Sequence, residues 1–372
     1  MRRSIILSIT LTIFLASCYE PYYPRVNSNQ KVLVVNGMIT DEYASYQIQL
    51  SYAAPFDSTG TGTPVDNAKV YVTDNLGKKF SFYYYGNGYY VSSPMEFTGH
   101  PGNAYNLHII TPDGEEYESD SQRLFPEVHP DSVYSEFDYK EILEKSSGSM
   151  VLSHGGDILV DVKNHSDTLP HFRFAANLVT QYFYSVCPMF QSCILYYCWQ
   201  TDNANSDINL TGGEYSIGSA SINKHNVCFI DDNLFCYGIV YTSRSTGGST
   251  YYAVPTTQYQ SCQIVNRILY LQQYTLNNET YEYYKNINLQ LQSEGKLFDP
   301  IAAQLYGNIK CISDPYVKAL GFFEASSVSH SAYKIDFRNL TDNQPSIKQI
   351  SYILPPASNG CEINNFPAFW IN

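Results

Sequence analysis

The sequence has few charged residues and lacks the short motifs that mark common enzymes. Charged side chains make up only 15% of the 372 residues. Serine hydrolases need a G-x-S-x-G elbow, zinc proteases an H-E-x-x-H helix and nucleotide-binding proteins a glycine-rich phosphate loop, and none of these occurs. The run His154-Gly155-Gly156 is similar to an oxyanion loop, but no nucleophile motif accompanies it, so a turn is the better interpretation. We therefore expect a protein that is not an enzyme.

A pattern of metal ligands is also missing. The eight histidines show no paired spacing that would present two imidazoles to one ion. The acidic run between residues 113 and 120 does not follow the D-x-[DN]-x-[DN]-G order of a calcium loop. We expect no metal and no cofactor. Glycosidases need only two carboxylates about 5 to 9.5 Å apart, and the 35 acidic residues of this chain could supply such a pair. A lipid-tethered hydrolase is therefore kept as the least favoured alternative.

Long apolar runs are absent except near the N-terminus. Two arginines precede the apolar residues Ile5 to Leu15, which are too few to cross a hydrocarbon core of roughly 30 Å as a helix. Leu15-Ala16-Ser17-Cys18 then places a thiol directly after small residues, as in a bacterial lipobox. We predict that residues 1–17 are a signal peptide and that Cys18 becomes the mature N-terminus, carrying a diacylglycerol thioether and an amine acylated by a fatty acid such as palmitate. A secreted protein with a chance cysteine is the alternative.

Basic residues are scarce. The predicted signal peptide holds two of the 22 lysines and arginines, so 20 basic residues remain against 35 acidic ones and the mature net charge is about −15. Such a chain repels a phosphate backbone, so we expect no nucleic-acid partner. The acidic surface favours solubility and identifies no ligand.

Cysteine is missing from the N-terminal half apart from Cys18. The other eight cysteines are Cys187, Cys193, Cys198, Cys228, Cys236, Cys262, Cys311 and Cys361. An even number in an oxidising compartment favours disulfides, and zinc is the weaker alternative because the spacings lack C-x-x-C pairs. Eight cysteines allow on the order of a hundred pairings. Among these we expect Cys228 with Cys236, across a short loop, and Cys311 with Cys361.

The remaining patterns predict a mainly β protein. Residues 18–30 contain prolines and no apolar periodicity, which indicates an extended, lipidated tether. Residues 31–125 hold short alternating strands joined by Gly, Asp, Asn and Pro turns, as in an antiparallel β-sandwich. The first strand should end at the turn pair Asn36-Gly37. Residues 126–372 should form a larger β-rich domain stapled by disulfides, with one helix over residues 278–294 between an Asn start signal and a terminating glycine.

The first domain carries a recognisable order of motifs. The pattern P-x-x-x-A-x-V-x-V-x-D-x-x-G begins at Pro64, a G-x-Y follows at Gly88, and a Y-x-L strand begins at Tyr105. This order resembles the transthyretin-like, Ig-like domains related to the carboxypeptidase regulatory domain. The resemblance implies a β-sandwich that acts as a spacer or docking module, and it implies no activity.

A second signature lies near the C-terminus. It comprises residues 297–304 (LFDPIAAQ), the turn Gly307-Asn308 and residues 319–329 (ALGFFEASSVS). With the lipobox and the sandwich, it resembles the Bacteroidota outer-membrane lipoproteins catalogued as domain of unknown function 4249, over nearly the whole chain. Ile301 departs from the family by replacing its usual second proline. We expect these motif residues to be structural, with residues 321–328 forming a strand against the core.

The same resemblance has implications for location and partners. Members are frequently encoded beside TonB-dependent receptors, which implies a lipid-anchored, surface-exposed outer-membrane protein that serves such a barrel as an accessory or binding subunit. The family brings no known catalytic residue to this chain. Only Glu20 supplies the acidic charge that surface lipoproteins tend to carry after the lipidated cysteine.

Tyrosine is abundant, with 35 copies. Its flat ring and hydroxyl tip suit sugar stacking and protein contacts. Clusters occur at residues 82–85, 89–90, 196–197 and 281–284. Because tyrosine also favours strands, most copies need no further explanation, and we expect one cluster to lie in a binding surface. A structural or adhesive envelope protein is the second interpretation of the sequence.

Overall fold

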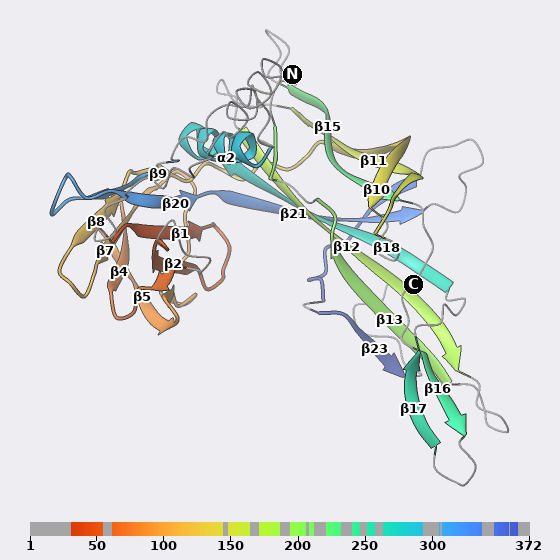
Figure 1. The fold of residues 1–372 in the computed structure, drawn as a ribbon. Coiled ribbons are helices and arrows are strands. Elements are labelled where there is room, and N and C mark those ends of the chain that lie inside the picture. The colour runs from red at the N-terminus through yellow and green to blue at the C-terminus, as the bar shows by residue number, and fades with distance from the viewer. Residues whose placement is uncertain are drawn as a thin grey trace, which may run out of the picture.

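The computed structural model of the chain is mainly β, as the strand patterns predict. It describes residues 31–54, 62–143, 148–163, 171–186, 194–205, 208–211, 221–231, 240–245, 251–256, 263–292, 305, 307–336, 346–356 and 358–363. Two β units and one helix make up this part of the chain (Figure 1). Among these residues no helix is long and apolar enough to cross a membrane.

The first β unit is a sandwich. Its N-terminal strands are β1 (Leu33–Ile39), β2 (Gln47–Tyr52), β3 (Thr63–Pro64), β4 (Lys69–Asp74), β5 (Lys79–Gly86), β6 (Tyr89–Val91), β7 (Ala104–Ile110), β8 (Glu116–Ser119) and β9 (Gln122–Arg123). Alternation along β1 and β7 turns every second side chain inward and buries Leu33, Val35 and Leu107 completely. β5 pairs with both β4 and β6 and so joins the two layers.

Two strands from the far end of the chain complete this sandwich. β19 (Ile309–Cys311) pairs with β8, and β20 (Ala319–Ala325) runs parallel to β1. Ile309 and Phe323 belong to the same buried core as the strands of the N-terminal part. The sandwich therefore contains residues from both sides of the boundary predicted near residue 126.

The second β unit has two sheets around a separate core. A three-stranded sheet has the order β10-β11-β15, and a larger sheet has the order β22-β21-β18-β12-β13-β23 with β14 beside β12. Val160, Phe172 and Leu269 lie in the core that these sheets share. The strands are β10 (Ser132–Leu143), β11 (Met150–Lys163), β12 (His171–Val186), β13 (Ile194–Asn203), β14 (Asn209–Leu210), β15 (Ser221–Asp231), β18 (Gln263–Leu276), β21 (Ser327–Asp336), β22 (Ser346–Ile350) and β23 (Gly360–Ile363), and a separate hairpin consists of β16 (Val240–Ser245) and β17 (Tyr251–Thr256).

The extended segment of β20 and β21 runs from one unit into the other (Figure 1). β20 ends at Ala325 and β21 begins at Ser327, so only Ser326 separates them. β20 pairs with β1 of the sandwich, whereas β21 pairs with β18 of the larger sheet. Ser326 is fully buried at the crossing, and its N–H donates to the carbonyl of Ile39 at 3.1 Å. The strand predicted for residues 321–328 thus belongs to both units.

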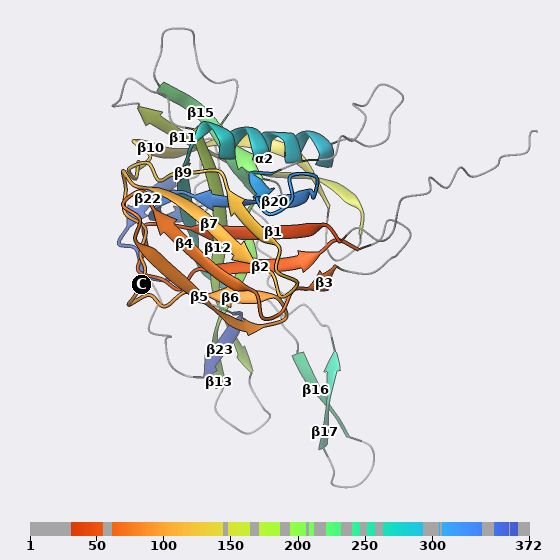
Figure 2. The ribbon, with the colours of Figure 1, turned by 90° about the vertical axis from the view of Figure 1, so that its left-hand side faces the viewer.

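The helix α2 (Asn278–Leu291) lies beside β9 and β20 (Figures 1 and 2). The side chain of Asn277 caps it by accepting from the N–H of Thr280 at 2.7 Å. The Asn277 amide and the Thr280 hydroxyl both donate to Gln122 Oε1 of β9, at 2.7 and 3.2 Å. The predicted helix over 278–294 is confirmed as far as Leu291, and residues 293 and 294 lie outside the described part of the chain.

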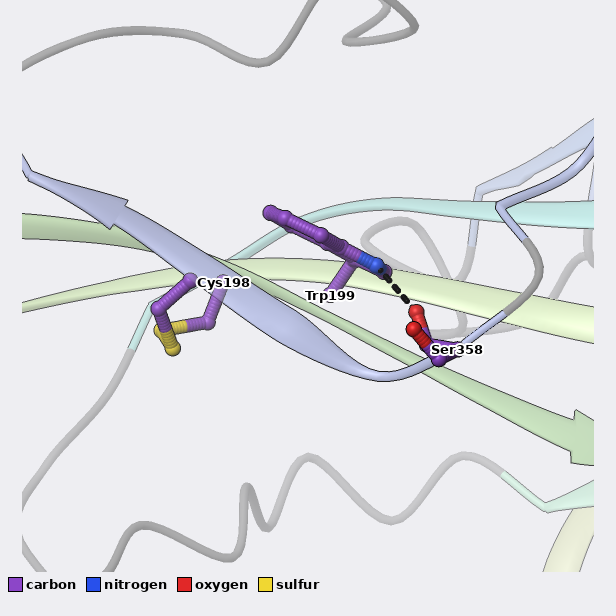
Figure 3. The surroundings of a disulfide bond; sticks show 4 residues. Cys198, Trp199 and Ser358 are labelled. Carbon is purple, nitrogen blue, oxygen red and sulfur yellow. Dashed lines mark hydrogen bonds between the residues drawn. A yellow bond between two sulfur atoms is a disulfide. The ribbon is translucent and has the colours of Figure 1, made fainter.

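One disulfide joins β13 to β23 (Figure 3). Cys198 and Cys361 occupy opposite positions in the antiparallel register. The adjacent Trp199 donates its indole N–H to the carbonyl of Ser358 at 2.6 Å, which holds the chain just before β23. The disulfide therefore fixes an edge strand that comes from the C-terminal end of the chain.

Both predicted cysteine pairings are wrong. Cys361 bonds to Cys198, and Cys228 and Cys311 are free, buried thiols. Cys311 lies in the core of the sandwich and Cys228 in that of the second unit, so apolar packing in two separate cores accounts for these residues. The predicted disulfide partners Cys187, Cys193, Cys236 and Cys262, and the predicted lipidation site Cys18, lie outside the described residues.

We predict that non-reducing peptide mapping will recover the Cys198–Cys361 cross-link. Cys228 and Cys311 should react with iodoacetamide only after unfolding, since both are buried and burial raises the pKa of Cys228 to about 12. Replacing Cys198 and Cys361 together by serine should lower the free energy of unfolding by about 2 to 5 kcal/mol, because the bond closes a long loop. A cross-linked peptide containing Cys228 or Cys311 would contradict the structure.

Candidate functional site

A cavity of about 480 Å³ opens on the outer face of the sandwich. Its floor consists of β1 and β2, and Tyr89 of β6 lies at its side. The lining residues are Asn36, Gly37, Met38, Thr40, Glu42, Ala44, Ser45, Tyr46, Gln47, Gln49 and Tyr89. The volume lies within the roughly 300 to 1,000 Å³ typical of small-molecule sites.

The strand register explains how these polar residues come together. Asn36 of β1 lies opposite Gln49 of β2, and Gln49 lies opposite Tyr89 of β6. On the other side Asn36 is in register with Phe322 of β20. Residues in register point to the same face, so two amides stand between two aromatic rings in one row across four strands. With strands about 4.8 Å apart, the row is about 14 Å long.

The sequence pattern suggested a turn at this point, and that prediction is wrong. Asn36 and Gly37 lie inside β1, which continues to Ile39. A Cβ at Gly37 would come within 3.0 Å of the Ile48 side chain, so the glycine here permits close packing between strands. The strand therefore carries Asn36 on its outer face.

The segment from Thr40 to Tyr46 forms one wall of the cavity. Tyr46 is buried and its hydroxyl donates to the backbone carbonyls of Thr40, at 2.6 Å, and of Glu42. Its N–H donates to the Ser92 hydroxyl at 2.9 Å. Because Tyr46, at one end of the wall, bonds to Thr40 at the other end and to Glu42 between them, the protein sets the shape of the wall without a ligand.

Glu42 is the only charged residue among the described residues that line the cavity, and it has a partner. Its Oε1 lies 2.7 Å from His330 Nε2 of β21, and its Oε2 accepts from the Thr40 hydroxyl at 3.3 Å. The hydrogen bond with His330 holds the pKa of Glu42 below its ordinary value. The neighbouring Asp41 accepts from the Val328 N–H at 3.0 Å. Both carboxylates thus attach the sandwich to β21.

A buried charge cluster lies beside the cavity, next to Met38. Met38, a lining residue, is in register with Glu324 of β20, whose side chain is almost fully buried. Arg173 Nη2 of β12 lies 3.3 Å from Glu324 Oε1 and 3.5 Å from Met38 Sδ. The Tyr284 hydroxyl of α2 donates to Glu324 Oε2 at 2.5 Å. Four elements, β1, β12, β20 and α2, therefore meet at one carboxylate.

Aromatic rings and hydroxyls compensate for much of the cost of burying these charges. The Arg173 guanidinium lies 4.0 Å from the Tyr274 ring centroid and 5.0 Å from that of Tyr284. The Ser326 hydroxyl donates to Glu324 Oε1 at 2.7 Å. Burial raises the pKa of Tyr284 well above its ordinary value, so this phenol keeps its proton and remains a donor. Burial is the strongest influence on the pKa of Arg173 and would lower it, but Glu324, Tyr284 and Tyr274 together raise it above its ordinary value.

The described lining of the cavity consists mainly of uncharged groups that form hydrogen bonds. Its amides and hydroxyls donate and accept hydrogen bonds, and one of these hydroxyls, that of Thr40, already donates to Glu42 at 3.3 Å. Among the residues that the structure describes, no group of three or more His, Cys, Asp or Glu side chains could hold a metal ion. In the acidic run near residue 113, Asp113 forms an exposed ion pair with Lys31.

The predicted tyrosine clusters have different locations. Tyr89 lines the cavity, Tyr284 belongs to the buried charge cluster, and Tyr83, Tyr84 and Tyr85 are exposed on β5. The amides beside Tyr89 were not predicted. The available signal was the alternation of β1 and β2, which places Asn36 and Gln49 on the outward face, but a solvated sheet face gives the same pattern.

Comparison with known proteins gives one match. The model of a family described as "Domain of unknown function (DUF4249)" matches residues 19–332. The match contains all the cavity residues and both charged partners, Arg173 and Glu324. No curated protein and no solved structure matches the chain significantly.

We predict that Glu324→Ala will lower the free energy of unfolding by about 3 to 5 kcal/mol, because it leaves the Arg173 charge buried without its partner. The double variant Arg173→Met, Glu324→Leu should recover most of this loss, since no buried charge remains. Urea unfolding measures both effects. The matched control is Lys31→Ala, which breaks an exposed ion pair and should cost less than about 1 kcal/mol. A cost for Glu324→Ala no larger than that of the control would contradict the prediction.

Proposed function

The chain belongs to the DUF4249 family, and from this premise we propose that it is a lipid-anchored outer-membrane protein that serves a TonB-dependent receptor as a non-enzymatic binding subunit. The observation that carries the binding role is the lining of the cavity on β1 and β2, which consists mainly of uncharged hydrogen-bonding side chains. A cavity that is already formed without a ligand, with no metal-binding cluster among the described residues, suits ligand capture.

The lipobox supports the location. Cys18 follows Leu15-Ala16-Ser17, and the matched family region begins at residue 19, directly after it. A single acyl chain anchors a protein only marginally, whereas the three chains of a mature bacterial lipoprotein give stable attachment. Residues 19–30 then separate the anchor from β1 and allow the cavity to approach a neighbouring membrane protein.

An exposed apolar face on β10 and β11 supports docking to a partner protein. Phe137, Tyr139, Leu143, Met150 and Leu152 are all exposed. The β10 and β11 register places Tyr139 opposite His154 and Leu143 opposite Met150, so their side chains share one face of the hairpin. β10 is also the edge strand of its sheet, and its outer backbone groups can accept another strand. We assign this hairpin face to the receptor.

The anchor is tested by Cys18→Ser. We expect the unmodified protein to incorporate labelled palmitate and to sediment with outer membranes, and the variant to lose both properties because it has no sulfur to acylate. A secreted reporter that carries residues 1–30 of each form controls for effects on folding. Equal membrane attachment of the two forms would refute the lipid anchor.

Receptor association is tested by purification from native membranes in mild detergent, with mass spectrometry of the proteins recovered. A TonB-dependent barrel should accompany the unmodified protein, and Phe137→Ser with Tyr139→Ser should lower its recovery at least about tenfold, because aromatic side chains dominate interface energies. The control, Leu76→Ser with Tyr85→Ser, removes two even more exposed apolar side chains from the sandwich and should not change recovery. Purification without any barrel would refute the receptor role.

An adhesive envelope protein is the second candidate, and one observation favours it. Three consecutive tyrosines of β5, Tyr83 to Tyr85, are exposed on the sandwich. Deletion of the gene would then weaken cell attachment and leave nutrient uptake unchanged, the reverse of the result expected for a receptor subunit.

A further inference from the structure

We propose that the cavity over β1, β2 and β6 binds a neutral saccharide. This inference rests on the binding role proposed above and names the class of ligand for that site. It is carried by three properties of the lining residues: their hydrogen-bonding groups, their charge and the pairing of the strands beneath them.

The first property is the mixture of donors and acceptors. Asn36, Gln47 and Gln49 each offer an amide nitrogen that donates and a carbonyl oxygen that accepts, and Ser45 adds a hydroxyl that does both. A saccharide presents hydroxyl groups that also donate and accept at the same atom. The side chains of Asn36 and Gln47 are exposed and that of Gln49 is half-buried, so their polar ends are available to a ligand.

The second property is the lack of available charge. Among the lining residues that the structure describes there is no lysine or arginine, so they offer phosphate, sulfate and carboxylate ligands no cationic partner. Glu42 is the one charged lining residue, and it is held by His330 at 2.7 Å and by Thr40. A cationic ligand would have to compete with His330 for this carboxylate. An uncharged ligand leaves the contacts of Glu42 with His330 and with Thr40 in place.

Tyr89 adds an aromatic surface to the amides. It stands at the end of the row, in register with Gln49, and is half-buried. A tyrosine ring gives an apolar face with a polar tip, which matches the alternation of C–H and O–H groups on a pyranose. Amides on one side and a ring on the other therefore allow a sugar ring to be held at its hydroxyls and at its apolar face.

The third property, the pairing of the strands beneath the cavity, favours a saccharide over a peptide as the ligand. Extended peptides are commonly recognised by addition to the free edge of a sheet. Beneath the cavity β1 is paired with β2 and β20, and β2 with β1, β3 and β6, so this floor offers no free edge where these strands meet. Recognition there must use side chains on a sheet face, and the available groups match hydroxyls.

The test uses the full-length acylated protein in a detergent without a sugar headgroup. The probes are an array of neutral oligosaccharides of glucose, galactose, mannose, xylose and N-acetylglucosamine, a matched set of sulfated and uronic oligosaccharides, and a library of neutral peptides. Titration calorimetry then measures the dissociation constant of the best neutral oligosaccharide. Tyr89→Ala should weaken it about tenfold, the effect of losing one good ring contact.

A second variant keeps the shape of the site. Asn36→Asp with Gln49→Glu preserves side-chain size but removes two donors and places two negative charges in the row, so binding should fall at least about a hundredfold. The matched controls are Tyr85→Ala and Asn75→Asp, which alter an exposed tyrosine and an exposed asparagine outside the cavity and should bind like the unmodified protein. Thermal unfolding checks that each variant is folded.

Binding of a neutral oligosaccharide that is lost in the cavity variants and retained in both controls supports the inference. Binding of no neutral oligosaccharide, a preference for the anionic set, a preference for peptides, or equal binding by cavity variants and controls would each overturn it. Recovery of the receptor with Asn36→Asp, Gln49→Glu should be unchanged, since the hairpin face on β10 and β11 is intact. Failure of the ligand assay is thereby distinguishable from failure of the receptor role.

Discussion

The structure depends on one extended segment that belongs to two sheets. β20 completes the sandwich by pairing with β1, and β21 begins after Ser326 and pairs with β18. A segment hydrogen-bonded on both sides of a single buried residue leaves little freedom for the sandwich to rotate against the larger sheet. The cavity lies beside this crossing, and strand pairing sets its floor, while the segment between β1 and β2 forms one of its walls.

The polar groups around the crossing fix it further. Glu324 of β20 bonds to Arg173 of β12 and to Tyr284 of α2. Asp41 and Glu42 bond to Val328 and His330 of β21, respectively. A buried ion pair contributes little net stability compared with apolar packing of the same volume, because both ions lose their hydration. Its effect here is on specificity, since a slip in the register of β20 would leave two buried charges without partners. The same constraint keeps Met38, which is in register with Glu324, at the rim of the cavity.

Local features of the fold follow from sequence, and its long-range pairings do not. The alternation of apolar and polar residues predicts the strands of the sandwich. Asn277 predicts the start of α2, because its side chain caps the helix. Nothing in the alternation of residues 319–325 indicates that they pair with β1, because β1 lies near the other end of the sequence. The predicted disulfides of Cys228 and Cys311 are wrong for a related reason. An even number of cysteines suggests oxidation, but each of these two thiols is buried in a different apolar core. The cavity was missed because outward polar residues on a strand have the same pattern whether they face water or a ligand.

The distribution of charge separates a binding site from a catalytic one. Catalytic acids and bases need a free proton or lone pair directed at a substrate. Around this cavity the charged groups are engaged with one another, Glu42 with His330 and Glu324 with Arg173 and Tyr284, and both sets hold the two β units together. The surface left for a ligand consists mainly of amides, hydroxyls and an aromatic ring. Using either carboxylate for chemistry would break contacts that shape the cavity, and this supports the binding role that we propose.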